Sequence, residues 1–177
     1  SDTIFLYNLL NKYGNLKNIS KFSGFYSYAF YDKKNNKITF SRDCIGKKFL
    51  YYYQNKDLFI LSSEEKGITP FIKKEIDNQS LLQYFYFKNL YYGKTFYKNI
   101  NLISPGSIFQ FDLNKWKIKS DKSWNTFYKK SFFKKKIQNN FNFNKLISNS
   151  IELRNKCDVN TQLALSSGLD SHLILNK

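Results

Sequence analysis

Methionine is absent from the 177 residues, even at position 1, and alanine occurs only at positions 29 and 164. The last residues, SHLILNK, stop within an apolar pattern rather than in a polar tail. A chain of this length can hold one domain or part of a larger protein cut across a boundary. We therefore expect an internal piece of a longer protein.

Long apolar runs and secretion signals are also missing. No stretch of about 18 apolar residues indicates a membrane span, and the first residues lack the basic region and cleavage site of a signal peptide. The two cysteines, Cys44 and Cys157, lie far apart without metal-ligand spacing. These absences predict a cytoplasmic protein with no membrane partner, whose cysteines are plain, partly buried thiols.

Acidic residues are few, since 13 Asp and Glu stand against 29 Lys and Arg for a formal net charge of +16. Such a charge is compatible with a basic nucleic-acid-binding module, which we keep as the alternative of another class. The lysines are scattered through turns, however, and the abundant Lys, Asn, Ile, Phe and Tyr have A/T-rich codons. We attribute the charge to composition and expect no nucleic-acid partner.

The residue pattern predicts a helix first and then strands. SDTIFLYNLLNKYG has apolar residues at helical spacing, with Asp2 at the N-cap position and Gly14 just past the end. Short β-rich runs between 22 and 62 predict an antiparallel sheet with tight turns. Apolar residues occupy both the odd and the even positions of these runs, so we expect other elements to cover both faces of the sheet. The runs are GFYSYAFYD, KITFSRD, FLYYYQ and LFILSS.

The remainder predicts a helix capped near Asn78, the extended segment KTFYKNINLISPG and a hairpin within SIFQFDLNKWKIKSDKSW. After Trp124 the sequence turns basic and irregular, so we place a domain boundary between about 125 and 138. A second helix follows, with Asn140 or Asn142 as a plausible cap. TQLALSSGLDSHLIL then predicts a strand, a turn and the start of another helix.

The turn in LALSSGLDSH suggests a phosphate site. The pattern predicts a short buried strand, 163–165, then a turn containing glycine, then a helix from Asp170 or Ser171. In this geometry backbone amides point toward one place, where they can bind an anion. Gly168 permits positive φ or close backbone approach, while serine hydroxyls add donors. Asp170 beside a phosphate would need a bridging ion such as Mg²⁺.

The P-loop of kinases and GTPases and the nucleophile turn of serine hydrolases are excluded. Their motifs, Gly-x-x-x-x-Gly-Lys-Ser/Thr and Gly-x-Ser-x-Gly, do not occur in the sequence. Taken alone, SSGLDS also fits an ordinary capped turn between a strand and a helix. A nucleotide loop and a capped turn therefore both stay open.

The surrounding motifs resemble one family, the glutamine-hydrolysing asparagine synthetases, over about the whole chain. LALSSGLDS is similar to the Ser-Gly-Gly-x-Asp-Ser pyrophosphate loop of the N-type ATP pyrophosphatases. The Arg42-Asp43-x-x-Gly46 turn is the most diagnostic of the earlier motifs. In order, the matching segments are SDTIFLYNLLNKYG, FSGFYSYAFYDKKNNKITFSRDCIGKKFLYYY, LFILSSEEKGI, GKTFYKNINLISPGSIFQFD and IELRNKCDVNTQ.

The resemblance implies a mixed α+β and α/β fold in two parts. Residues 1–125 would form the second half of an αββα Ntn-type class II glutaminase sandwich, and residues 126–138 a basic linker. Residues 139–177 would begin a Rossmann-like ATP pyrophosphatase domain with a helix, a strand, a loop and a helix.

The implied reaction is ATP-dependent synthesis of asparagine from aspartate, through β-aspartyl-AMP and with glutamine-derived ammonia. Glutamine, aspartate and ATP with Mg²⁺ are the implied small-molecule partners, and the full-length enzyme could form a homodimer. Relatives that use another carboxylate or a sugar as acceptor remain an alternative. The implied ATP-binding residues are Leu165, Ser166, Ser167, Gly168, Leu169, Asp170 and Ser171, with Asp170 also the candidate magnesium ligand.

In that family an N-terminal cysteine attacks glutamine and uses its own α-amine as base. Cys44 and Cys157 are internal and offer no such amine, so we expect no catalytic residue in this chain and no activity from it alone. Asp2 matches the aspartate that pairs with the substrate ammonium. The same residue also suits a helix cap, and one carboxylate could serve both roles.

Some positions depart from the family pattern. Ser167 replaces a loop glycine, so its side chain could narrow the phosphate pocket if that position needs positive φ. His172, the one histidine, could contact a phosphate or lie on the surface of the first helical turn. Arg42 and Asp43 could form a catalytic pair, but we interpret them as a structural ion pair that pins the turn at Gly46.

Overall fold

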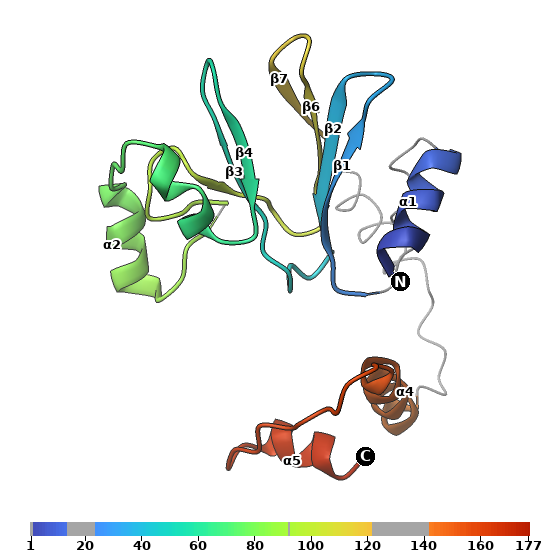
Figure 1. The fold of residues 1–177 in the computed structure, drawn as a ribbon. Helices are drawn as coiled ribbons and strands as arrows, with labels where there is room; N and C mark the ends of the chain where they lie inside the picture. Colours follow the sequence, from blue (N-terminus) through green and yellow to red (C-terminus); the bar gives the residue numbers. More distant parts are fainter. Residues whose placement is uncertain (1, 14–23, 92, 122–141) are drawn as a thin grey trace. The chain divides into compact units, whose positions relative to one another are not determined.

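The structure, a computed structural model, describes residues 2–13, 24–91, 93–121 and 142–177 (Figure 1). The chain divides into two compact units, residues 1–132 and 133–177, which we describe separately. No helix in these ranges is long and apolar enough to cross a bilayer. The predicted linker, residues 126–138, lies outside the described residues.

The first unit alternates helices and antiparallel hairpins. Its elements are α1 (Asp2–Tyr13), β1 (Ser27–Asp32), β2 (Lys37–Arg42), β3 (Tyr51–Gln54), β4 (Phe59–Ser62), the 3-10 helices η2 (Glu65–Gly67) and η3 (Thr69–Phe71), α2 (Asn78–Phe87), β5 (Asn101–Leu102), β6 (Ile108–Asp112) and β7 (Lys117–Asp121). The first helix and the hairpin within 107–124 are therefore confirmed.

The strands form two sheets rather than the single sheet predicted for 22–62. One sheet has the order β1-β2-β6-β7 and the other has the order β4-β3-β5, with every neighbouring pair antiparallel. The connection between β2 and β3 carries the chain from one sheet to the other. The single-sheet prediction was wrong because strand spacing along the sequence does not reveal that a connection changes sheets.

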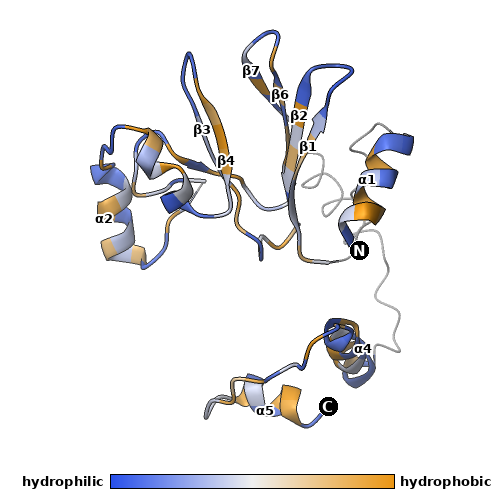
Figure 2. Ribbon diagram, in the orientation of Figure 1, coloured by the Kyte–Doolittle hydropathy of each residue, from blue (hydrophilic) through white to orange (hydrophobic). Residues whose placement is uncertain are grey.

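The main core lies between the sheets. Phe40, Ile103 and Phe111 are fully buried there, and the rings of Phe59 and Phe111 stack with centroids 4.0 Å apart. Figure 2 shows the matching pattern, with hydrophilic hairpin turns and apolar residues along the strands. Because strand side chains alternate, the other face of the first sheet is free to pack elsewhere.

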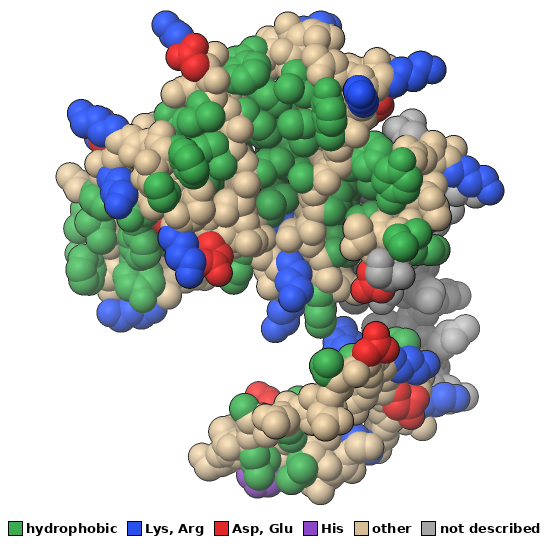
Figure 3. Space-filling model, in the orientation of Figure 1, with side chains coloured by type: hydrophobic (Ala, Val, Ile, Leu, Met, Phe, Trp, Pro, Cys, Tyr) green, Lys and Arg blue, Asp and Glu red, His purple; other side chains and the backbone are tan. Residues whose placement is uncertain are grey.

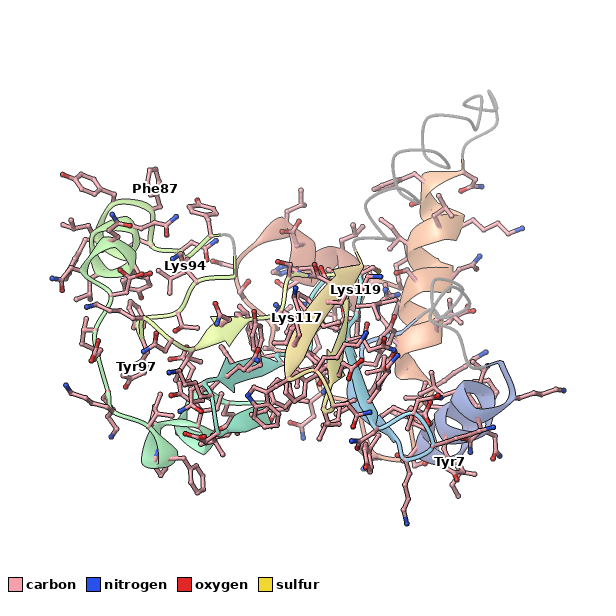
Figure 4. The ribbon with its side chains drawn as sticks, turned by 90° about the horizontal axis from the view of Figure 1, so that it is seen from above. Tyr7, Phe87, Lys94, Tyr97, Lys117 and Lys119 are labelled. Carbon is pink, nitrogen blue, oxygen red and sulfur yellow. The ribbon has the colours of Figure 1, made fainter. Side chains whose placement is uncertain are left out.

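Helix α1 packs on that other face. Leu10 of α1 and Tyr28 of β1 are buried together. The ring centroids of Tyr7, labelled in Figure 4, and Phe30 are 6.3 Å apart. Burial of one leucine contributes about 2 kcal/mol. The first sheet is thus covered on both faces, as its sequence predicted.

Trp116 joins the tips of two hairpins. Its indole Nε1 donates to the carbonyl of Asn55 at 2.7 Å, and Gln54 Nε2 donates to the Trp116 carbonyl at 2.9 Å. Trp116 has φ of +51°, which is unusual for a residue with a large side chain. These contacts fix the distance between the two sheets at that end.

Helix α2 is capped by Asp77, whose carboxylate accepts from the Gln79 amide at 3.1 Å and the Ser80 hydroxyl at 2.9 Å. The prediction of a helix capped near Asn78 is confirmed, with Asp77 as the cap and Asn78 as the first helical residue. Figure 3 shows apolar side chains reaching the surface over this helix. Those with the highest exposure are Leu82, Phe85, Tyr86 and Phe87.

The second unit contains α4 (Phe143–Asn155) and α5 (Leu169–Leu175). Asn142 caps α4 by accepting from the Lys145 amide at 3.0 Å, as one of the two predicted caps. The predicted buried strand at 163–165 is wrong, because those residues form no strand, and Leu163 and Leu165 are 40% and 54% exposed. A lone strand is unstable, and residues 142–177 supply no second strand to pair with it.

Candidate functional site

Asp2 is the first residue of α1, so it lies one position past the N-cap that the sequence suggested. The cap position itself, residue 1, is outside the described residues. A carboxylate in the first turn still interacts favourably with the positive end of the helix dipole. Its side chain is exposed and thus accessible to a positively charged ligand group.

Arg42 ends β2 and binds three backbone carbonyls with its buried guanidinium. Nε donates to Lys48 O at 2.7 Å, Nη1 donates to Ile103 O at 2.8 Å, and Nη2 donates to Gly46 O. The same guanidinium lies 4.9 Å from the ring centroid of Phe49. One side chain thus holds the β2–β3 connection against the segment that follows β5.

Asp43 binds the same connection through its backbone N–H groups. It is fully buried, and its carboxylate accepts from four successive backbone N–H groups. Oδ1 accepts from Ile45 at 3.1 Å, Gly46 at 2.8 Å and Lys47 at 3.1 Å, and Oδ2 accepts from Lys48 at 3.0 Å. The donors are pre-arranged around one anion, as in a backbone nest.

The predicted Arg42–Asp43 ion pair is wrong. Among the described residues, the ion pairs within 4.0 Å do not include these two side chains. Arg42 ends β2 and Asp43 begins the connection, and each side chain has backbone partners of its own. Their roles are structural, as predicted, but each acts on the backbone of the connection, where Gly46 has φ of +74°.

Burial and hydrogen bonding oppose each other at Asp43. Burial would raise the pKa of this carboxyl, but the N–H donors of Lys48, Lys47, Gly46 and Ile45 outweigh it and hold the pKa below its ordinary value. Burial lowers the pKa of Arg42, while the negative charge of Asp43 raises it in part. Arginine nevertheless remains charged at any pH at which the protein folds.

Both cysteines are free thiols. Cys44 is half-buried, as expected, but Cys157 is exposed, with Sγ 3.1 Å from the Val159 carbonyl. Cys157 follows the end of α4 in a segment without apolar cover, which is why the prediction of partial burial failed for it. Neither sulfur belongs to a group of three or more His, Cys, Asp or Glu side chains in the described ranges.

The serine-rich loop is held by contacts between its own residues. The Ser166 and Ser171 hydroxyls lie 3.1 Å apart, and Ser171 Oγ also donates to the carbonyls of Ser166 at 3.0 Å and Gly168 at 2.9 Å. The Ser166 amide donates to Ser171 Oγ at 3.2 Å, and the Gly168 amide donates to Ser166 Oγ at 3.2 Å. These bonds close the turn that precedes α5.

Positive φ is not required anywhere in this loop. Gly168 is the N-cap of α5 with φ of −80°, and Ser167 is not among the described residues with positive φ. Of the two roles expected for Gly168, positive φ is therefore not used, and the serine at 167 introduces no backbone strain. Helix α5 begins at Leu169, so the amides of Leu169, Asp170 and Ser171 have no acceptor within the helix.

The predicted ATP-binding residues thus lie on the turn at 165–168 and in the first turn of α5, and all of them are exposed except the half-buried Ser171. His172 lies in the first turn of α5 with Nδ1 3.1 Å from the Gly168 carbonyl. Asp170 is the one carboxylate of the turn. Magnesium commonly binds one or two carboxylates together with substrate phosphates, so this donor set fits an ion that arrives with a phosphate.

Sequence reasoning missed an open hollow of about 510 Å³ between the sheets. Its lining comes from strands that are distant in sequence, so no local motif could have indicated it. The lining residues are Tyr52, Gln54, Asn101, Phe109, Trp116, Lys117, Ile118 and Ser120.

Comparison with known proteins agrees with the resemblance in the motifs. The glutamine amidotransferase domain family matches residues 1–124. A protein of Methanocaldococcus jannaschii, provisionally named a glutamine-hydrolysing asparagine synthetase, is 33% identical over 180 residues, which cover 99% of this chain and 34% of the relative. Asparagine synthetase (glutamine-hydrolysing) 1 of Bacillus subtilis is 26% identical over 163 residues, which cover 89% of this chain and 25% of the relative.

The chain therefore spans about a third or less of the length of these relatives. The family match covers all of the described first unit, from α1 through both sheets to β7. The chain belongs to the glutamine amidotransferase domain family, with glutamine-hydrolysing asparagine synthetases among its relatives.

Proposed function

We propose that this protein takes part in ATP-dependent synthesis of asparagine from aspartate, with ammonia derived from glutamine. The single observation that supports this reaction most is the similarity over 99% of the chain to a relative whose name assigns it to the asparagine synthetases. The similarity continues past the amidotransferase match at residue 124 and through the serine-rich loop.

In the first unit, Asp2 would bind the ammonium group of glutamine. Its carboxylate is exposed at the start of α1, where it can form an ion pair with a cation. Helix α1 is held to the first sheet by Leu10 and Tyr28, which fixes the position of this carboxylate. Cys44 and Cys157 are peptide-bonded at both sides and thus have no α-amine to act as the base.

In the second unit, the loop 165–171 would bind the phosphates of ATP. The amides of Leu169, Asp170 and Ser171 are donors for phosphate oxygens, and Asp170 would hold Mg²⁺. Bound Mg²⁺ would neutralise phosphate charge while aspartate is adenylated. The chain's own contribution is positioning and electrostatic stabilisation.

The remaining predictions depend on this assignment. Residues 1–125 would belong to an αββα glutaminase sandwich, 126–138 to a linker and 139–177 to the start of a Rossmann-like synthetase domain. A cytoplasmic enzyme acting on small molecules, without nucleic-acid or membrane partners, follows from the same proposal. A homodimer would be the expected assembly of the full-length enzyme.

The protein as encoded should form asparagine from aspartate, ATP and amide-labelled glutamine, with the label recovered in the side-chain amide. Another carboxylate or a sugar as the labelled product would identify an amidotransferase with a different acceptor. The 177-residue chain alone should hydrolyse no glutamine, and measurable hydrolysis by it would contradict the assignment of the nucleophile to residues outside it.

The loop can be tested separately. In the protein as encoded, Gly168→Val and Asp170→Asn should reduce ATP-dependent product at least tenfold and spare glutamine hydrolysis. Val159→Ser, on an exposed segment outside the loop, serves as the matched control. Unchanged synthesis in both loop variants would overturn the phosphate role while leaving the glutaminase assignment standing.

A further inference from the structure

Tyr28 joins helix α1 to the first sheet. It is 9% exposed and forms a buried cluster with Leu10 of α1, against which Leu6, Tyr26 and Phe30 pack. We call this group the Leu10–Tyr28 cluster. Figure 1 shows α1 beside β1, the strand that carries Tyr28. The position of α1 on the sheet therefore depends on this cluster.

The sheet side of the cluster is fixed by hydrogen bonds. Tyr28 pairs with Ser41 of β2, and the fully buried Ser41 hydroxyl donates to the Ser107 carbonyl at 3.0 Å. Two residues before Tyr28, the carbonyl of Tyr26 accepts from the Asp43 amide at 2.8 Å. The strand under the helix is thus anchored to two other segments, so α1 is the element that can shift when the cluster is weakened.

The helix side of the cluster leads to Asp2. Asp2, Leu6 and Leu10 follow one another at intervals of four residues, and such residues lie on one face of a helix. Asp2 therefore lies on the face of α1 that packs on β1, two turns before Leu10. A rotation or a slide of α1 on the sheet would displace the Asp2 carboxylate with it.

From these contacts we propose that Tyr28 is a positioning residue for Asp2 and acts through Leu10 and α1. The inference rests on the proposed binding of the glutamine ammonium group by Asp2. A charge-assisted hydrogen bond depends on geometry, so a small displacement of the carboxylate weakens it. Loss of the Tyr28 ring therefore weakens glutamine binding, while the attack on the amide, assigned to a nucleophile outside this chain, keeps its rate.

The test measures glutamine hydrolysis by the protein as encoded. Tyr28→Ala should raise the KM for glutamine about fivefold and leave kcat within about twofold, as expected when binding alone is weakened. Tyr28→Phe keeps the ring that packs on Leu10 and should restore the wild-type KM. Tyr28→Leu keeps apolar volume in the cluster, so it tests the same contact if Tyr28→Ala does not fold, with an expected rise of about threefold.

Tyr52→Ala is the matched control, because it removes the same type of ring from the core between the sheets. Tyr52 packs there against Phe40, with ring centroids 6.1 Å apart. This variant should leave the KM for glutamine within about twofold. Equal rises in KM for Tyr28→Ala and Tyr52→Ala would show a general loss of structure and overturn the proposal.

A double variant separates the positioning role from the role of Asp2 itself. Asp2→Asn should raise the KM about tenfold, and Tyr28→Ala added to it should raise the KM no further, because the positioned charge is already lost. Independent, multiplying effects would overturn the proposal. An unchanged KM in Asp2→Asn would remove the substrate role of Asp2 and the positioning role together. A raised KM in Asp2→Asn but not in the Tyr28 variants would overturn the positioning role alone.

Discussion

Arg42 and Asp43 are adjacent in the chain and opposite in charge, yet they bind the backbone of one loop instead of each other. The arginine donates to carbonyls and the aspartate accepts from amides. Each charge is thus solvated by the protein backbone, which replaces the water that burial removes. The turn between the sheets is consequently among the most constrained parts of the first unit.

Asp43→Asn should lower the free energy of unfolding by about 3 kcal/mol, because an amide cannot accept from four N–H groups as a carboxylate does. The folded-state pKa of Asp43 lies below its unfolded value. Its stabilisation is therefore present above the unfolded pKa and is lost as the pH falls through the folded pKa. Urea denaturation between pH 7 and pH 2 should show a shallower acid loss in the variant than in the wild type, and equal slopes would contradict this.

Gly46→Ala should be more damaging than Gly24→Ala, although both residues have positive φ. A Cβ at Gly46 would lie 2.7 Å from Pro105 Cγ and 2.9 Å from Arg42 Nη2, whereas one at Gly24 meets no atom within 4 Å. Backbone strain alone costs about 1 kcal/mol, and the clash adds to it at position 46. Thermal unfolding midpoints should fall at least twice as far for Gly46→Ala.

Asp77→Ala should lower the Tm by a few degrees, since it removes the cap of α2 and the 3.9 Å contact with Lys94. The pKa of Asp77 is lowered mainly by the Ser80 hydroxyl. Asn78→Ala, one residue later, should leave the Tm nearly unchanged because Asn78 is not the cap. The reverse order of effects would contradict the assignment of the cap.

Phe40→Ala should lower the free energy of unfolding by about 4 kcal/mol, because the fully buried ring packs against three aromatic neighbours. Tyr31→Ala, in the neighbouring strand at 53% exposure, should cost less than about 1 kcal/mol. Denaturant titration of both variants measures the two losses of stability. Similar losses at the two positions would argue against burial of Phe40 in the core between the sheets.

Local patterns predicted local structure well. The helix at 2–13, the hairpin at 107–124 and the Asn142 cap depend on neighbours within a few residues, so the sequence contained the needed information. The strand at 163–165 was wrong for the opposite reason, because an apolar run becomes a strand only when another strand pairs with it.

The sequence by itself determined the family, since its ordered motifs resemble the family that the comparison matches over residues 1–124. It also located Asp2 and the serine-rich loop as candidates. Only the tertiary structure decided which strands belong to which sheet and in what order, that Arg42 and Asp43 act separately, and that Ser167 has no backbone strain. Residue type fixes which bonds a side chain can make, whereas the partner it meets depends on how distant segments pack.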